Sequence, residues 1–132
     1  MQWPWKKHKP RPEPVIVDTP FGQFEKRDDR EWEGYVDYAE NDIQVFVNDV
    51  GGAPDPVFLA RLAFILENIT LLEKNAREYV TILTDQYEFS AIQSASDGND
   101  FTLAFSYDEE GWGESVFVDF KGLEVVIWGR VD

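Results

Sequence analysis

The fold is decided by residues 55–83, DPVFLARLAFILENITLLEKNAREYVTIL, the one long stretch with a helical repeat. Apolar side chains recur in it every three or four residues, which is the spacing of one face of an α-helix. They are Phe58, Leu62, Ile65, Ile69, Leu72, Ala76, Val80 and Leu83. We therefore predict a helix, or two consecutive helices, over about 56–84, with this apolar face in the core.

The ends of this helical stretch are also marked. Asp55 is a good N-cap because its carboxylate can accept from free backbone amides, and Pro56 suits the first helical position. Thr70 and Glu73 have the spacing of a capping box. The sequence therefore predicts a helix start at Asp55 and a break near Asn68.

Strand-like segments precede the helical stretch. Residues 31–38 alternate between apolar and polar, with Trp32, Gly34, Val36 and Tyr38 on one face. Residues 43–48 alternate again after a polar turn at 39–42, and residues 21–27 form a shorter candidate. Two alternating segments separated by a short turn predict an antiparallel hairpin.

Strand-like segments also follow the helical stretch. The candidates are residues 87–95, 101–107, 115–120 and 123–128, separated by turns at Asp97-Gly98, Glu110–Gly113 and Lys121-Gly122. In the last candidate we expect Leu123, Val125 and Ile127 to share a face. Short connections favour antiparallel pairing.

These segments together predict an α+β fold. We expect a single antiparallel sheet of about six strands, in the order strands, helix or helical pair, strands, with the helix packed on one face. The domain would span residues 15–132. Residues 1–14 would form a flexible, basic, Pro-rich tail, because four prolines there favour extended backbone.

The charge is divided unevenly along the chain. The 132 residues include 12 Lys and Arg against 26 Asp and Glu, a net charge of −14. Four of the basic residues and one acid lie in residues 1–14, so residues 15–132 carry 8 basic and 25 acidic side chains, a net of −17. A body this acidic repels nucleic acid and attracts a basic protein.

Several kinds of catalysis are excluded or disfavoured by the residues present. The chain has no cysteine, and its one histidine, His8, lies in the Pro-rich tail. No P-loop or dinucleotide-binding pattern occurs, and no EF-hand spacing is found among the acids. We therefore predict no catalytic residue, no metal and no cofactor. A hydrolase that uses carboxylates such as Glu31 and Glu33, with or without a divalent cation, is the alternative.

A second alternative concerns the tail. Trp3 and Trp5 beside Lys6, Lys7 and Lys9 could contact an anionic membrane surface. The acidic body opposes that approach, so we do not expect membrane binding. No apolar stretch has the length of a membrane span, and we expect a cytoplasmic protein.

Two stretches resemble uncharacterised bacterial domain families of unknown function. They are TPFGQFEKRDDREWEGYVDY (Thr19–Tyr38) and GWGESVFVDFKGLEVVIWG (Gly111–Gly129). Members of such families open on a Phe-Gly strand, carry Trp-x-Gly in the next strand and close on two Gly-bounded strands. The resemblance implies a bacterial cytosolic α+β domain, and it assigns no catalytic residue.

The face of the sheet that points away from the helix is the predicted binding surface. Aromatic side chains among carboxylates, with few lysines, are typical of a surface that binds a basic partner. The predicted partner-binding residues are Glu31, Glu33, Tyr35, Asp37, Phe46, Phe117, Asp119, Glu124 and Trp128. We therefore expect a non-enzymatic protein-interaction module, with an immunity or antitoxin-like role against a cationic toxin as its sharpest form.

Overall fold

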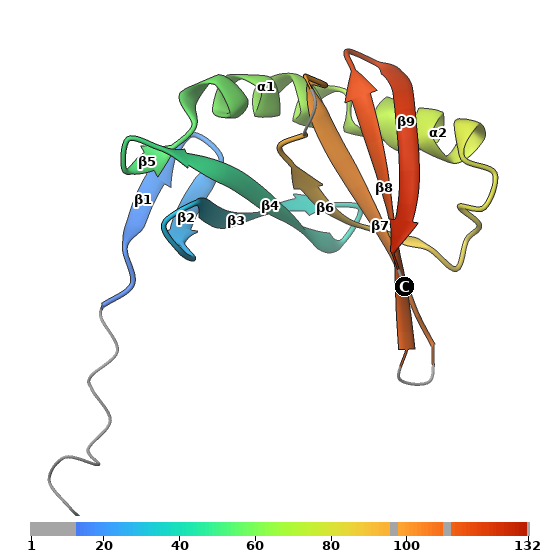
Figure 1. Cartoon of the computed structure of the whole chain (residues 1–132), viewed down its shortest axis with the longest axis horizontal. Coiled ribbons are helices and arrows are strands. Elements are labelled where there is room, and N and C mark those ends of the chain that lie inside the picture. Colours follow the sequence, from blue (N-terminus) through green and yellow to red (C-terminus); the bar gives the residue numbers. More distant parts are fainter. Residues whose placement is uncertain (1–12, 96–97, 110–111, 132) are drawn as a thin grey trace, which may run out of the picture.

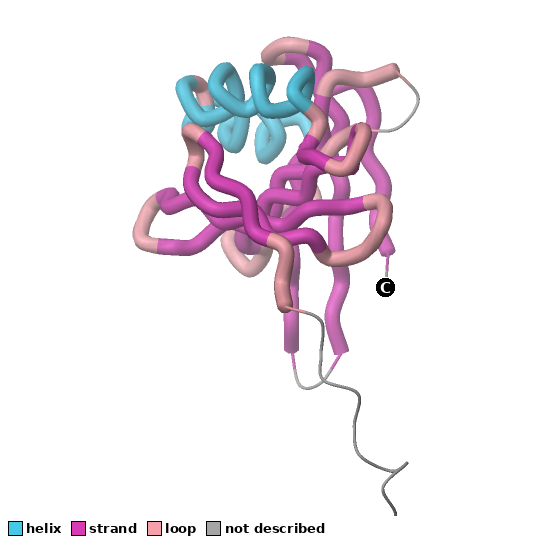
Figure 2. Tube along the Cα trace, turned by 90° about the vertical axis from the view of Figure 1, so that its left-hand side faces the viewer, coloured by secondary structure: helices cyan, strands magenta, loops and turns pink. Residues whose placement is uncertain are grey.

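Two helices lie on one face of a large twisted sheet in the computed structural model, which describes residues 13–95, 98–109 and 112–131 (Figures 1 and 2). The first half contains strands β1 (Ile16–Thr19), β2 (Gly22–Lys26), β3 (Glu31–Tyr38), β4 (Asn41–Val50) and β5 (Ala53–Pro54). Helices α1 (Pro56–Glu67) and α2 (Ile69–Tyr79) follow, and then β6 (Glu88–Gln93), β7 (Phe101–Glu109), β8 (Trp112–Lys121) and β9 (Glu124–Val131). The α+β class is confirmed.

The sheet is larger than predicted, and one of its pairings differs. Over the described residues it has nine strands rather than about six, in the order β1-β2-β3-β4-β6-β7-β8-β9, with β5 paired to β4. Two of the additional strands, β1 and β5, are too short to show alternation in the sequence. Among these described strands, β4 and β6 pair in parallel and the other pairs are antiparallel. A parallel pair arises there because the two helices carry the chain back along the sheet between these strands.

The helix start is confirmed, and the break has a different cap from the predicted one. The Asp55 carboxylate accepts from the Val57 amide at 2.9 Å, and Pro56 occupies the first turn. Asn68 separates the helices, as predicted, and its side-chain amide donates to the Phe64 carbonyl at 2.9 Å. Thr70 lies inside α2, so the expected capping box is absent.

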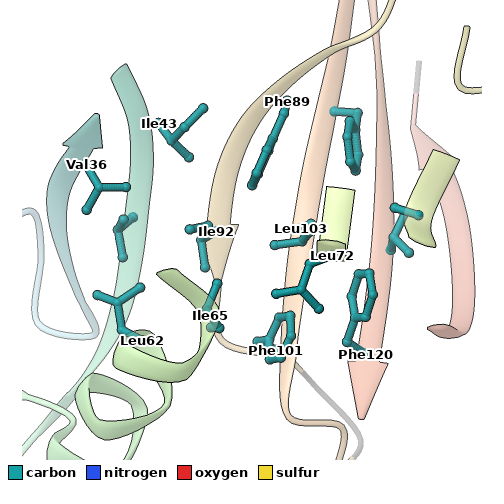
Figure 3. Packing of buried hydrophobic residues seen from close by; sticks show 14 of the residues in the cluster. Val36, Ile43, Leu62, Ile65, Leu72, Phe89, Ile92, Phe101, Leu103 and Phe120 are labelled. Atoms are coloured by element: carbon teal, nitrogen blue, oxygen red, sulfur yellow. The ribbon is translucent and has the colours of Figure 1, made fainter. Parts of the chain in front are cut away.

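The core lies between the helices and one face of the sheet (Figure 3). Leu62 and Ile65 of α1 and Leu72 of α2 are fully buried. They meet the inward side chains of the central strands, which are Val36, Ile43, Val45, Phe89, Ile92, Phe101, Leu103, Phe105, Val116, Val118 and Phe120. The helical stripe predicted from the sequence is therefore the core face.

An irregularity in β9 changes the faces predicted for the end of the chain. Phe120 pairs with Val125, but the preceding Asp119 pairs with Ile127, so Val126 is an extra residue in β9. Such a bulge reverses the alternation beyond it. Ile127 therefore lies on the side opposite Val125, and the prediction that these two share a face is wrong.

Some predictions fall on residues that the structure does not describe. Residues 1–12 of the predicted tail lie outside the described part, as do Asp97 and residues 110–111 of two predicted turns. The predicted turn at Lys121-Gly122 is confirmed: Gly122 has a φ of 56°, and Lys121 pairs with Glu124 across it. Neither helix of the described part is long and apolar enough to cross a bilayer.

Candidate functional site

The face of the sheet opposite the helices carries two rows of side chains, which the strand register aligns. We call this surface the open face. One row runs through Glu33, Phe46, Gln93, Thr102, Asp119 and Ile127. The second row runs through Tyr35, Gln44, Ala91, Ala104, Phe117 and Gly129. Both helices of the described chain pack on the other side (Figure 2), so neither covers the open face.

The first part of the open face, on β2–β4, holds its own cation. The Arg27 guanidinium lies 5.4 Å from the centre of the Phe46 ring, and its Nε is 3.4 Å from a carboxylate oxygen of Glu33. The other oxygen of Glu33 accepts from Gln44 at 2.8 Å and from the Tyr35 hydroxyl at 3.1 Å. All five of these groups therefore already contact one another.

Glu31 belongs to the same group. Its carboxylate lies 3.7 Å from the Arg27 guanidinium, and both side chains are substantially exposed. Of the predicted binding residues, the structure thus brings together Glu31, Glu33, Tyr35 and Phe46. Because Arg27 already lies against them, this cluster has less attraction left for an incoming cation.

The second part of the open face contains a hollow of about 490 Å³ over β6–β9. We call it the β8 hollow. It is lined by Gln93, Ser94, Thr102, Phe117, Asp119, Ile127, Trp128 and Gly129. Its volume is in the range of roughly 300–1,000 Å³ that is typical of small-ligand sites. Three of the predicted residues, Phe117, Asp119 and Trp128, therefore line one concave surface.

The carboxylate of Asp119 is held in place by neutral donors. The Thr102 hydroxyl donates to one oxygen at 2.6 Å, and the Asn99 side-chain amide donates to the other at 3.2 Å. Thr102 is buried, whereas Asp119 is half-buried. No Lys or Arg of the described ranges forms an ion pair with Asp119, so its charge is oriented but not neutralised by a cation there.

Asp37 is paired with another acid at the exposed end of the β3–β4 hairpin. It lies directly opposite Asp42 in the register. The pKa of Asp42 is raised by the hydrogen bond that its protonated form makes with Asp37 and by repulsion between the two carboxylates. Both side chains are exposed to solvent. The pair therefore lacks the enclosing cleft that carboxylate catalysis requires.

Trp128 and Glu124 lie outside the two rows of the open face. The bulge places Trp128 opposite the core residue Val118, on the helix side of the sheet, although Trp128 also borders the β8 hollow at the sheet edge. Glu124 follows the β8–β9 turn and lines a separate hollow of about 450 Å³ beside α2. Trp128 belongs to neither row because the alternation in β9 is interrupted at Val126, and Glu124 lies before that bulge, next to the β8–β9 turn.

A group of hydrogen-bonded polar residues connects α2 to β3 and to the segment that precedes β6. The Tyr38 hydroxyl donates to Glu73 at 2.7 Å, and Arg77 pairs with the same carboxylate at 2.9 Å. Arg77 also donates to the Thr84 and Tyr87 carbonyls. Burial and the hydrogen bond to Glu73 raise the pKa of Tyr38, so the phenol stays protonated at neutral pH. All of these groups have partners, which indicates a structural role.

No metal centre is found in the described ranges, where no three His, Asp or Glu side chains converge. Asn99 and Asp100, which precede β7, are engaged in internal contacts. Asp100 accepts from the Gly122 amide at 2.8 Å and lies 3.7 Å from Arg61, while Asn99 holds Asp119.

The sequence missed five residues of the β8 hollow: Gln93, Ser94, Thr102, Ile127 and Gly129. Thr102 alternates with Phe101 and Leu103, so its face was predictable from the pattern of β7. Its contact with Asp119 was not, because that contact depends on the register between β7 and β8. Ile127 was assigned to the wrong face because nothing in its local sequence marks the bulge.

Comparison with known proteins adds no relative. No protein-family model matches the chain, and no curated protein and no solved structure matches it either. The family resemblance of the two quoted stretches therefore gains no support.

Proposed function

We propose that the chain is a non-enzymatic interaction module that binds a basic protein through the open face. The observation that carries the proposal is the β8 hollow, in which the oriented carboxylate of Asp119 lies beside Phe117 without a cation from the described ranges. Apolar surface would supply affinity and the carboxylate would supply selectivity for a basic group.

The charge of the whole chain supports the same proposal. Residues 15–132 carry 25 acids against 8 bases. A surplus of this size speeds the encounter with a cationic protein and repels nucleic acid. Binding should therefore weaken steeply as salt is added.

The sharpest form of the proposal is an immunity or antitoxin-like role. A toxin that acts on nucleic acid needs a cationic surface to bind its substrate. An acidic protein that occupies that surface would compete with the substrate for the same charges. Purified partner should then lose its activity when this chain is added in equimolar amount.

A pull-down from the native host, with matched charge-reversal variants, tests the proposal. The bait is the full chain as wild type, Asp119→Lys on the open face, or Glu67→Lys on the exposed surface of α1. We expect wild type and Glu67→Lys to retain the same basic protein at low salt. Asp119→Lys should lose it, and so should wild type at about 0.5 M salt, where screening is strong.

Two results would contradict the proposal. One is the recovery of no basic protein at low salt. The other is equal retention by Asp119→Lys and wild type, which would show that the open face does not make the contact.

A further inference from the structure

The open face contains one arginine site that is filled from within the chain. At β2–β4 the Arg27 guanidinium lies over the Phe46 ring, 5.4 Å from its centre, and 3.4 Å from Glu33. The same carboxylate accepts from the amide of Gln44. An aromatic ring, a carboxylate and a neutral donor to that carboxylate thus hold one guanidinium.

The β8 hollow repeats these groups without the guanidinium. Phe117 and Asp119 are two residues apart on β8, so both point to the open face. Asp119 accepts from Thr102 and Asn99, as Glu33 accepts from Gln44 and Tyr35. The hollow therefore presents a phenylalanine ring and an oriented carboxylate, as the Arg27 site does, to a group from another molecule.

The hydrogen-bonding capacity of the hollow also favours a guanidinium. Each oxygen of Asp119 accepts one neutral donor, and a carboxylate oxygen has room for a further one. Two parallel N–H groups of an arginine match that remaining capacity. Ser94 lines the same hollow, and its buried hydroxyl has no hydrogen-bond partner among the described residues.

We propose that the β8 hollow binds one arginine side chain of the basic partner, with the guanidinium paired to Asp119 and stacked on Phe117. This inference rests on the proposed function, because it names the group that the partner inserts. Arginine is favoured over lysine, since a planar and weakly hydrated guanidinium can stack and pair at the same time, whereas an ammonium is a compact, strongly hydrated charge.

The test is an NMR titration of the full chain with capped tripeptides. The probe is acetyl-Gly-Arg-Gly-amide, and the matched controls carry citrulline or lysine in place of arginine. We expect saturable shifts of the backbone amide signals of Gln93, Thr102 and Asp119 with the arginine peptide. The citrulline peptide has the same shape without the charge, and it should bind at least about tenfold more weakly.

Two variants of the hollow and one control variant complete the test. Asp119→Asn should weaken arginine binding about tenfold or more, and Phe117→Leu, which leaves every charge in place, should weaken it severalfold. Glu67→Gln removes one charge from α1 and should leave the affinity unchanged. Phe117→Leu keeps the test decisive if Asp119→Asn fails to fold.

Two outcomes would overturn the inference. One is equal binding of the arginine and citrulline peptides, and the other is shifts that remain in both variants of the hollow. If either outcome appears while Asp119→Lys still loses the partner in the pull-down, the arginine site is wrong and the proposed function stands. If the peptide binds at Asp119 but no partner depends on the open face, the arginine site stands and the proposed function fails.

Discussion

Gly34 leaves no room for a β-carbon. An added Cβ would lie 2.8 Å from the terminal carbon of the Phe24 ring, and that ring is fully buried. We expect Gly34→Ala to lower the free energy of unfolding by about 1–3 kcal/mol, because a packed ring has to move. Urea unfolding measures the loss. Gly129→Ala is the control, since its Cβ would meet nothing within 4 Å. Equal effects of the two substitutions would contradict the steric explanation.

The Asp37–Asp42 pair predicts a gain in stability when one charge is removed. The pKa of Asp42 is raised in the folded chain, so folding is favoured at low pH and loses that advantage as pH rises through the raised pKa. Asp42→Asn should therefore raise Tm at pH 7, and the difference should shrink as pH falls toward 3.8, the usual Asp value. Thermal unfolding at several pH values tests this. Glu67→Gln removes one charge from the end of α1, outside the sheet, and should raise Tm less.

The β3–β4 hairpin turns through two residues that are poorly suited to it. Ala39 and Glu40 have φ values of 50° and 70°, in the left-handed region that costs non-glycine residues roughly 1–2 kcal/mol each. The double substitution Ala39→Asn/Glu40→Gly should raise the free energy of unfolding by about 1 kcal/mol, since Asn-Gly favours this turn. Chemical denaturation measures the change.

The β4–β5 turn allows the opposite test, in which a glycine with a positive φ is replaced. Gly51 has a φ of 63°, and Gly51→Ala should lower stability by about 1 kcal/mol. If neither set of substitutions changes the free energy of unfolding, the left-handed backbone conformations of these turns do not limit stability.

At the level of elements, sequence patterns predicted what depends on local residues. The alternation of β3 gave its bounds, Glu31–Tyr38, and Asp55 with Pro56 gave the helix start. Both signals are local: side-chain periodicity in one case, and a cap in the other. The parallel pairing of β4 with β6 was missed because it depends on where the helices return the chain. The faces of β9 were missed because a single extra residue, Val126, leaves no mark in the sequence.

The candidate site likewise combines features that the local sequence predicts with features that depend on contacts between strands. The acidity and the outward direction of Phe117 and Asp119 followed from composition and alternation. The neutralisation of Glu33 by Arg27 did not, because it joins residues of β3 to the residue that follows β2. Contacts across strands require the register, and nothing in one sequence fixes it for nine strands.

For the whole molecule, the surplus of negative charge should make stability depend on salt. A net charge of −14 means that acids repel one another in the compact state more than in the expanded one. Raising NaCl from about 0.05 M to about 0.5 M screens that repulsion and should raise Tm. Differential scanning calorimetry tests this. A Tm that stays constant or falls would show that the acids are balanced by local partners.

The bulge at Val126 has a further consequence, for solubility. β9 is an edge strand, and Val126, Ile127, Trp128 and Val131 are all more than a third exposed. A straight apolar edge of this kind recruits strands from other molecules, and an irregular, more twisted edge resists them. Deleting Val126 would leave the pairs Phe120–Val125 and Asp119–Ile127 in place while straightening the strand. The shortened chain should therefore self-associate more than the wild type as its concentration rises.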